Sequence, residues 1–155
     1  MTKKQDIKNA STVGGDIEDF TRDENGNIYP TIENFYRFCS ERKLMGIKCK
    51  ECGNILAPPK MSCSKYDSYK FDWITLKGKG KLLTYSIVHV APTDFQAIAP
   101  YIVGIVELEE GPKLPGIVKL KKVEDIKIGM DLVTDFEKTS IESWVGNTRY
   151  YFKQP

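Results

Sequence analysis

Three cysteines within fifteen residues constrain this chain more than any other feature of its sequence. Cys49 and Cys52 form a C-x-x-C pair followed by Gly53, and Cys63 lies eleven residues beyond Cys52. Two thiolates on one tight turn can converge on a single tetrahedral ion, and the glycine allows that turn a positive φ angle. The pattern predicts a zinc ribbon.

The second half of the ribbon departs from the pattern at its fourth ligand. Tyr66 stands where a fourth thiolate is expected, and Asp67 stands where a glycine is expected. The predicted metal ligands are therefore Cys49, Cys52 and Cys63. A structural zinc site needs four ligands, so Asp67, water or another group would complete it.

Cys39 is a further candidate, because it could in principle reach back to the site. It falls on the apolar face of a predicted helix, however, where a free cysteine behaves as a small hydrophobe. Three outcomes stay open for the ribbon: bound zinc, a shape held by packing alone, or a Cys–Cys bond. Redox catalysis by the C-x-x-C pair is not expected, because no βαβ pattern surrounds it.

Positive charge is concentrated on the ribbon and its exit. The chain has a net charge of +2, but residues 41–81 alone hold 10 basic and 4 acidic side chains, a net +6. Residues 1–40 and 82–155 are each net −2. This distribution suits an anionic partner, either a phosphate-bearing ligand or a nucleic acid. Solvated lysine-rich loops are the alternative interpretation.

The chain is expected to be cytoplasmic. No apolar stretch approaches the roughly 20 residues that a membrane helix needs, and the first residues lack the apolar segment of a secretory signal.

An amphipathic helix is predicted from the N-cap Thr31 to about Lys43, with Gly46 closing it. It carries an aromatic stripe that is expected to dock the helix onto the rest of the fold. The residues before it are polar and predict a mobile tail, with a short helical piece around Asp16–Thr21. The predicted organisation is a tail (1–30), the helix (31–46), a zinc-ribbon-like domain (47–71) and a barrel domain (72–155).

After the ribbon, the apolar period changes from helical to strand-like. β-Branched and aromatic residues dominate five segments that are separated by glycine and proline turns. Five strands without a long helix between them predict a mainly β protein with a five-stranded OB-fold barrel. The predicted strands are 81–91, 101–109, 115–121, 131–138 and 148–153.

Catalysis is poorly provided for, so the chain is not expected to be an enzyme. His89 is the only histidine, and without a second one no Cys–His or Ser–His nucleophile pair can be assembled. A second function class is a single-stranded nucleic-acid-binding module, because OB-folds bind such strands through aromatic side chains on a basic groove. The net negative charge of the barrel segment argues against it. The aromatic residues available there are Tyr85, Phe95, Tyr101, Trp144, Tyr150 and Tyr151.

Taken in order, these features resemble the zinc-ribbon/OB-fold family of acyl-CoA-associated proteins, formerly a domain of unknown function. The resemblance covers about residues 30–153. The family's fourth cysteine aligns with Tyr66. The motifs that carry the resemblance are Cys49-x-x-Cys52-Gly53, Pro58-Pro59-Lys60, Cys63, Gly78-Lys79-Gly80, the strand ending in His89, Pro100-Tyr101, Glu107-Leu108-Glu109-Glu110-Gly111 and Ile128-Gly129-Met130.

The resemblance implies an N-terminal helical segment, a rubredoxin-like ribbon and a C-terminal OB barrel. Members of the family are typically non-catalytic partners of thiolase-like enzymes. An archaeal member bridges acetoacetyl-CoA thiolase and hydroxymethylglutaryl-CoA synthase in the mevalonate pathway, and others support thiolases or lipid-transfer-type aldolases. The chain is thus expected to be an acyl-CoA-binding accessory protein that joins a thiolase and a partner enzyme such as that synthase.

Candidate acyl-CoA contacts follow from charge and position. Coenzyme A carries several phosphate charges, which a basic ribbon–barrel junction could hold. The aromatic stripe of the helix could shield the pantetheine arm or dock on a partner enzyme. The candidate residues are Lys60, Lys77, Lys79 and Lys81 for the phosphates, and Phe35, Tyr36 and Phe38 for the stripe.

Overall fold

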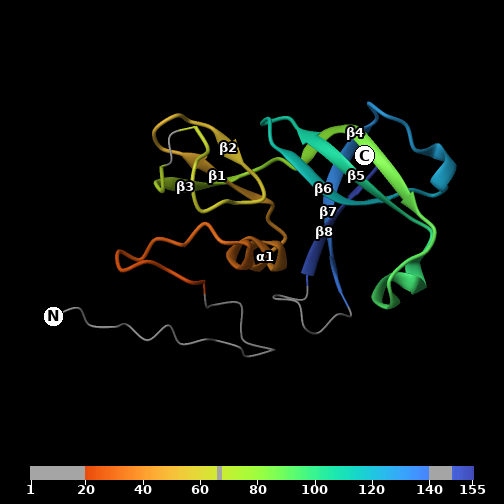
Figure 1. Ribbon diagram of the computed structural model, residues 1–155, viewed down its shortest axis with the longest axis horizontal. Coiled ribbons are helices and arrows are strands. Elements are labelled where there is room, and N and C mark those ends of the chain that lie inside the picture. Colours follow the sequence, from red (N-terminus) through yellow and green to blue (C-terminus); the bar gives the residue numbers. More distant parts are fainter. Residues whose placement is uncertain (1–19, 66–67, 140–147) are drawn as a thin grey trace.

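The computed structural model describes residues 20–65, 68–139 and 148–155. They form a three-stranded sheet and a closed five-stranded barrel, with one α-helix in contact with both (Figure 1). The mainly β class predicted from the sequence is confirmed. The α-helix and strands are α1 (Ile32–Ser40), β1 (Met45–Cys49), β2 (Ile55–Leu56), β3 (Phe71–Thr75), β4 (Lys79–Val88), β5 (Tyr101–Leu108), β6 (Lys113–Lys119), β7 (Asp131–Lys138) and β8 (Thr148–Lys153), with short 3₁₀ helices at Thr93–Ile98 and Val123–Asp125.

The helix α1 forms where the sequence predicts it and buries its aromatic face. Thr31 caps it, because its hydroxyl accepts a hydrogen bond from the Asn34 N–H at 3.2 Å. Phe35, Phe38 and Cys39 are buried. The apolar stripe therefore docks the helix onto the rest of the fold, as expected.

The helix ends at Ser40, before the Lys43 expected from the sequence. Arg42 adopts the left-handed conformation with a φ of 59°, and the Lys43 N–H donates to the Phe38 carbonyl at 3.0 Å. This is the usual geometry of a helix C-terminus, here without the glycine that commonly supplies it. The predicted closure at Gly46 is wrong, because Gly46 lies inside β1.

The segment 20–30 is not a free tail. Its chain turns back on itself through a bridge between Arg22 and Ile28. The Ile28 carbonyl then accepts a hydrogen bond from the Trp73 indole N–H at 2.9 Å, which fixes the turn to β3. Most of the helical piece predicted at 16–21 lies outside the described residues, and its last two residues are not helical.

The small sheet has the strand order β2-β1-β3, and both pairings are antiparallel. Ile47 of β1 lies opposite Leu56 on one side and Trp73 on the other. Residues 72–75, which the sequence analysis assigned to the barrel, thus belong to β3 and extend the ribbon sheet. The limits of the domains themselves stay a prediction.

The barrel closes in the order β4-β5-β6-β8-β7, with β7 pairing back onto β4. All its pairings are antiparallel except β6–β8, where Val118 lies opposite Phe152 in a parallel register. Five strands closed in this way form an OB-fold. At the start of β4, Gly80 crosses so near β5 that a Cβ there would clash with the carbonyl oxygen of Glu107.

One apolar core runs from α1 into the barrel, and it includes Phe35, Leu44, Leu76 and Phe152. The helix α1 therefore shares its packing with both sheets. Within the described ranges, no helix is long and apolar enough to cross a membrane.

Candidate functional site

The three ribbon cysteines converge at one corner of the small sheet. The Sγ atoms of Cys49, Cys52 and Cys63 all lie within 4.8 Å of one another, and those of Cys52 and Cys63 are 3.5 Å apart. Cys49 ends β1, and its carbonyl accepts a hydrogen bond from the Gly53 N–H at 2.9 Å. Gly53 has a φ of +71°, so the positive φ predicted for this turn is confirmed. We call residues 49–53 the knuckle turn.

Local backbone groups favour thiolate ligands in this corner. A hydrogen bond from the backbone N–H of Cys52 lowers the pKa of the Cys49 thiol, and the N–H of Glu51 acts in the same direction. The Asn54 N–H favours the Cys52 thiolate, but burial and the neighbouring thiols raise the pKa of Cys52 overall. A metal ion that binds such thiols displaces their protons.

The cluster suits a metal ion that prefers sulfur. Three thiolates are three of the four ligands in a tetrahedral zinc site, and their mutual spacing allows one ion to contact all of them. Tyr66 and Asp67, which occupy the fourth position in the sequence, lie outside the described residues. Cys39 is not part of the cluster. It lies on the core-facing side of α1 and is fully buried among apolar residues, as expected from the sequence.

Two of the four candidate lysines form ion pairs with acidic side chains. Lys77 lies just before β4, and its ammonium is 3.6 Å from a carboxylate oxygen of Glu109. The Lys81 ammonium is 2.8 Å from Asp131. Lys79 lies between them along the chain, and no ion pair joins it to the residues that the structure describes. These carboxylates reduce the positive charge that the sequence alone suggested.

Lys79 and Lys81 line an open hollow of about 360 Å³ at the start of β4. Lys60 and Lys77 are not part of its lining, so the structure does not gather all four lysines in one place. The lining consists of Lys79, Gly80, Lys81, Glu109, Asp131, Leu132, Val133 and Pro155.

The candidate aromatic residues belong to α1 and pack against neighbouring side chains instead of forming an open surface. Phe35 is fully buried and packs edge-on against Tyr150 of β8. Phe38 is 5.0 Å from the ring of Trp73, measured between centroids. Tyr36 is half-buried beneath the guanidinium of Arg149. A ligand could reach the first two rings only if α1 moved away from the core.

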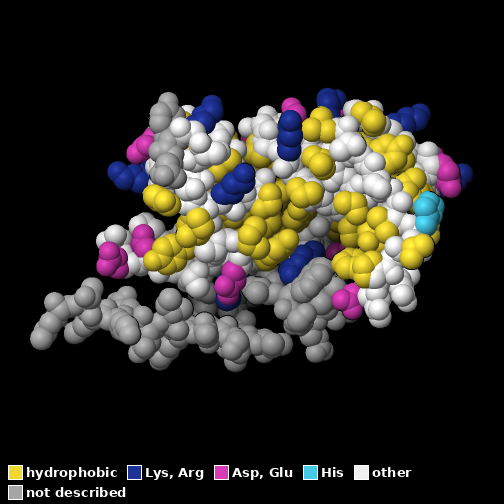
Figure 2. All heavy atoms as spheres, in the orientation of Figure 1, with side chains coloured by type: hydrophobic (Ala, Val, Ile, Leu, Met, Phe, Trp, Pro, Cys, Tyr) yellow, Lys and Arg dark blue, Asp and Glu magenta, His cyan; other side chains and the backbone are white. Residues whose placement is uncertain are grey.

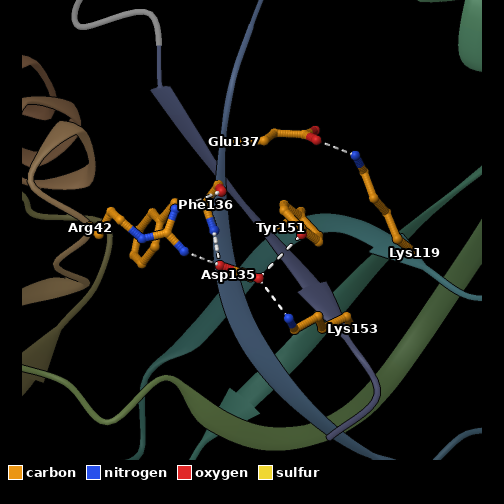
Figure 3. Close-up of polar contacts among 7 residues, drawn as sticks. All are labelled: Arg42, Lys119, Asp135, Phe136, Glu137, Tyr151 and Lys153. Atoms are coloured by element: carbon orange, nitrogen blue, oxygen red, sulfur yellow. Dashed lines mark hydrogen bonds and ion pairs between the residues drawn. The ribbon is translucent and has the colours of Figure 1, made fainter.

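A cluster of charged side chains around Asp135 connects the end of α1 to the barrel (Figure 3). Its carboxylate accepts hydrogen bonds from Arg42 at 2.7 Å and from Lys153 at 2.6 Å. The Tyr151 hydroxyl donates to the same carboxylate at 3.3 Å. The Lys153 ammonium and the Phe136 N–H lower the pKa of Asp135 to about 2. This cluster is not apparent from the sequence, because Arg42 and Asp135 are 93 residues apart.

The hairpin formed by β4, β5 and the segment between them has an apolar outer surface. Among residues 82–106, Asp94 is the only formally charged side chain, in a chain with 28% charged residues. Six of the large hydrophobic side chains on this hairpin are exposed: Leu83, Tyr85, Val90, Ile98, Val103 and Ile105. We call this surface the apolar hairpin face. In Figure 2, hydrophobic side chains gather over the barrel half of the molecule.

This face was also missed from the sequence, although a signal was present. A run of twenty-five residues with one charge is unusual in so charged a chain. His89, predicted within a strand, lies just beyond the end of β4 and is exposed.

The chain is similar to archaeal proteins along most of its length. It is 41% identical to a DUF35 domain-containing scaffold protein of Methanocaldococcus jannaschii, over 76% of this chain and 81% of that one. A protein with the same description from Methanothermobacter thermautotrophicus is 32% identical, over 79% of this chain and 93% of that one.

Domain and structure comparisons agree with this similarity. A family profile described as the C-terminal OB-fold domain of ChsH2 matches residues 73–137. A solved structure titled Ltp2-ChsH2(DUF35) aldolase superposes with a TM-score of 0.68 at 27% identity, covering 78% of this chain and 91% of that one. A DUF35-family protein from Sulfolobus solfataricus shares the fold, with a TM-score of 0.53 at 16% identity over 79% of this chain and 84% of that one.

Proposed function

Since this chain belongs to the family of DUF35 domain-containing scaffold proteins, we propose that it is a non-catalytic accessory protein that binds acyl-CoA and bridges a thiolase to a partner enzyme. Hydroxymethylglutaryl-CoA synthase is the partner that we favour. Such a bridge would keep a CoA thioester near both active sites, so that an unfavourable condensation is coupled to the next reaction. A related solved structure pairs ChsH2 with Ltp2 in an aldolase, which supports an enzyme as the partner.

The observation that carries this proposal is the apolar hairpin face. Its outward side chains include Val103 and Ile105 of β5, which lie opposite Ile117 and Pro115 of β6. Centres of protein interfaces are depleted in charged residues, because a charge buried without a partner is costly. A surface of this composition fits an equally uncharged face of a folded enzyme subunit, and we assign it to the thiolase.

A matched pair of variants tests this docking surface. Ile105→Lys places a charge on the face, while Ile128→Lys places the same charge on an exposed hydrophobic residue in the loop before β7. Affinity for the thiolase, measured by biolayer interferometry, should fall at least tenfold for Ile105→Lys and stay unchanged for Ile128→Lys. An equal loss of affinity in the two variants would contradict the assignment of the apolar hairpin face to the thiolase. Self-association of the wild-type chain that Ile105→Lys abolishes would instead identify a second copy as the occupant.

The open hollow at the start of β4 is our candidate for the CoA phosphates. Lys79 is its least neutralised cation, and Lys81 can turn from Asp131 toward a phosphate because both side chains are largely exposed. Lys60 and Lys77 would contribute long-range attraction only. The aromatic stripe would support the site indirectly, because it fixes α1 in place. Of its residues Phe35, Tyr36 and Phe38, only Tyr36 is partly exposed.

Isothermal titration calorimetry tests the assignment of the CoA phosphates to this hollow. CoA is the ligand, and dephospho-CoA is titrated for comparison. Lys79→Ala and Lys81→Ala should each weaken CoA binding about threefold to tenfold, the effect of roughly 1 kcal/mol. Lys113→Ala on β6 is the control and should bind CoA as the wild type does. Unchanged affinity in both hollow variants would refute the phosphate assignment. Salt-sensitive binding of single-stranded oligonucleotides without CoA binding would replace the whole proposal with the nucleic-acid alternative.

Zinc is the metal that we propose for the three cysteines, in a structural role. Cys49, Cys52 and Cys63 would each supply a thiolate and hold the small sheet together at one corner. The ion would supply no chemistry to an acyl-CoA, because it would lie in the ribbon. Metal analysis of the purified chain should find one zinc per molecule, and Cys63→Ser should lose it.

A further inference from the structure

The ribbon cysteines differ in how a reagent in solution can reach them. Cys49 and Cys63 have no more than 1% of their surface exposed, whereas Cys52 is partly exposed. The Sγ atoms of Cys52 and Cys63 are 3.5 Å apart, so a buried thiol lies directly behind an accessible one. Solvent access and a neighbouring second thiol are two features of reversible oxidation sites.

We propose that Cys52 and Cys63 form a reversible disulfide whenever the cluster holds no metal, so that metal loading and oxidation are alternative states of the ribbon. Joining the two sulfur atoms requires them to approach to about 2.05 Å, a shift of roughly 1.5 Å from their present spacing. The loop between Cys52 and Cys63 is held in place at both ends. Cys52 belongs to the knuckle turn, and the Cys63 N–H donates to the Ser68 carbonyl at 2.9 Å.

The oxidant is a small-molecule disulfide, and the exchange proceeds in two steps. The Cys52 thiolate attacks one sulfur of the small disulfide, forms a mixed disulfide and releases one small thiol. The Cys63 thiolate then attacks the Cys52 sulfur and releases the second small thiol. Two protein thiols have then lost two electrons and two protons, which the small disulfide has gained.

The two states exclude each other because they use the same sulfur atoms. A zinc ion needs deprotonated thiolates, and the disulfide would leave Cys49 as the only free ligand among the three. Conversely, a bound ion would occupy the lone pairs with which Cys52 attacks. The disulfide involves neither the apolar hairpin face nor the hollow at β4, so its failure would leave the proposed scaffold role untouched.

The sequence makes the proposed bond easy to map. Lysines at positions 48, 50, 60 and 65 place each ribbon cysteine on a separate tryptic peptide. The full-length chain is stripped of metal with a chelator and a reductant, then treated with oxidised glutathione, alkylated and digested. We expect a cross-linked pair of peptides 51–60 and 61–65 that is two hydrogen atoms lighter than their sum. Zinc added before the glutathione should reduce this product at least tenfold.

Zinc uptake provides an independent measurement. The oxidised chain should take up less than a tenth of the zinc bound by the reduced chain, and dithiothreitol should restore uptake. Cys49→Ser is the matched variant, since it should lose zinc binding but keep the cross-link. Its folding is checked by circular dichroism.

Three results would overturn the proposal. A bond between Cys49 and Cys52 would show that the wrong pair was chosen. A stable glutathione adduct on Cys52 without a cross-link would show that the Cys63 thiolate does not attack the mixed disulfide. Equal oxidation with and without zinc would show that the two states do not compete.

Discussion

Asn34 is a buried polar residue that fastens the segment before α1 to the helix. It is 0% exposed, and its side-chain amide donates to the Thr21 carbonyl at 3.0 Å and to the Tyr29 carbonyl at 2.9 Å. Its side-chain oxygen accepts from the Thr21 N–H at 3.1 Å. One amide group thus satisfies several backbone groups that would otherwise be buried without partners.

Replacing this amide should be costly. Asn34→Ala leaves those groups unpaired, and each loss costs about 1–3 kcal/mol, so the free energy of unfolding should fall by at least about 2 kcal/mol. Glu33→Gln on the exposed side of the same helix should change it by less than about 0.5 kcal/mol. Urea denaturation of the two variants measures both values. A similar small effect of both would mean that water replaces the amide contacts.

Asp135 makes stability depend on pH in acid. The Lys153 ammonium holds the pKa of this carboxyl near 2, below its ordinary 3.8. Because the folded pKa is lowered, the contribution of Asp135 is fully present above about pH 4 and is lost as the pH falls toward 2. Asp135→Asn should therefore lower Tm at pH 7, and its difference from the wild type should vanish as the pH approaches 2.

Asp131 provides a matched control for this pH series. Its ion pair with Lys81 is more exposed than the pair between Asp135 and Lys153. Exposed pairs contribute little, so Asp131→Asn should lower Tm at pH 7 less than Asp135→Asn does. A pH-independent difference between wild type and Asp135→Asn would contradict the assigned contacts.

The helix α1 depends on one aromatic residue for its place against the barrel. Phe35 is fully buried and packs on Tyr150, whose hydroxyl donates to the Pro115 carbonyl. Phe35→Ala should lower the free energy of unfolding by about 3–5 kcal/mol, because it removes a large ring from a packed core. Ile32→Ala, at the largely exposed start of α1, should cost far less.

Hydrogen exchange separates a local effect from a global one. Phe35→Ala should raise exchange in α1 and β8 more than in β4 and β5, because β8 is the barrel strand most in contact with α1. A uniform rise over the whole barrel would show that α1 and the barrel unfold as one unit.

The small sheet should respond to metal removal, and the barrel should not. Its three strands are short and depend on the cysteine corner, whereas the barrel is closed by its own strand pairings. Chelation of a zinc-loaded sample should raise hydrogen exchange over residues 45–65 and leave β5 and β7 unchanged. Unchanged exchange in the ribbon would mean that packing alone maintains its shape.

Local signals in the sequence predicted most elements and the cysteine corner. A knuckle turn depends only on Cys49, Cys52 and Gly53, which are near neighbours, and five separated β-rich segments are enough to indicate a barrel. The end of α1 could not be predicted in the same way. Arg42 adopts a positive φ that its residue type does not indicate, and tertiary contacts to Asp135 hold it there.

The charged site was predicted less well, because ion pairs join residues far apart in the chain. The lysines near β4 are basic in sequence, but Glu109 and Asp131 reach them only in the folded barrel. The same limit applies to the aromatic stripe. Its spacing indicates one face of a helix, but not that both Phe35 and Phe38 are buried.

Taken as a whole, the molecule separates a basic region from an apolar one. Residues 41–81, which include the ribbon and the start of β4, have a net charge of +6, whereas the apolar hairpin face is nearly uncharged. Two surfaces of such different character can contact a phosphate-bearing ligand and a protein at the same time. This separation is the basis on which we expect one chain to hold acyl-CoA while it is docked on a thiolase.

The most direct test of this account is a pull-down of the tagged chain from its native host at low salt, with the co-purifying proteins identified by mass spectrometry. We expect to recover a thiolase in stoichiometric amount, together with hydroxymethylglutaryl-CoA synthase, and to lose the thiolase when Ile105→Lys is used as bait. Recovery of nucleic acid or its processing enzymes, with no acyl-CoA enzyme, would contradict it.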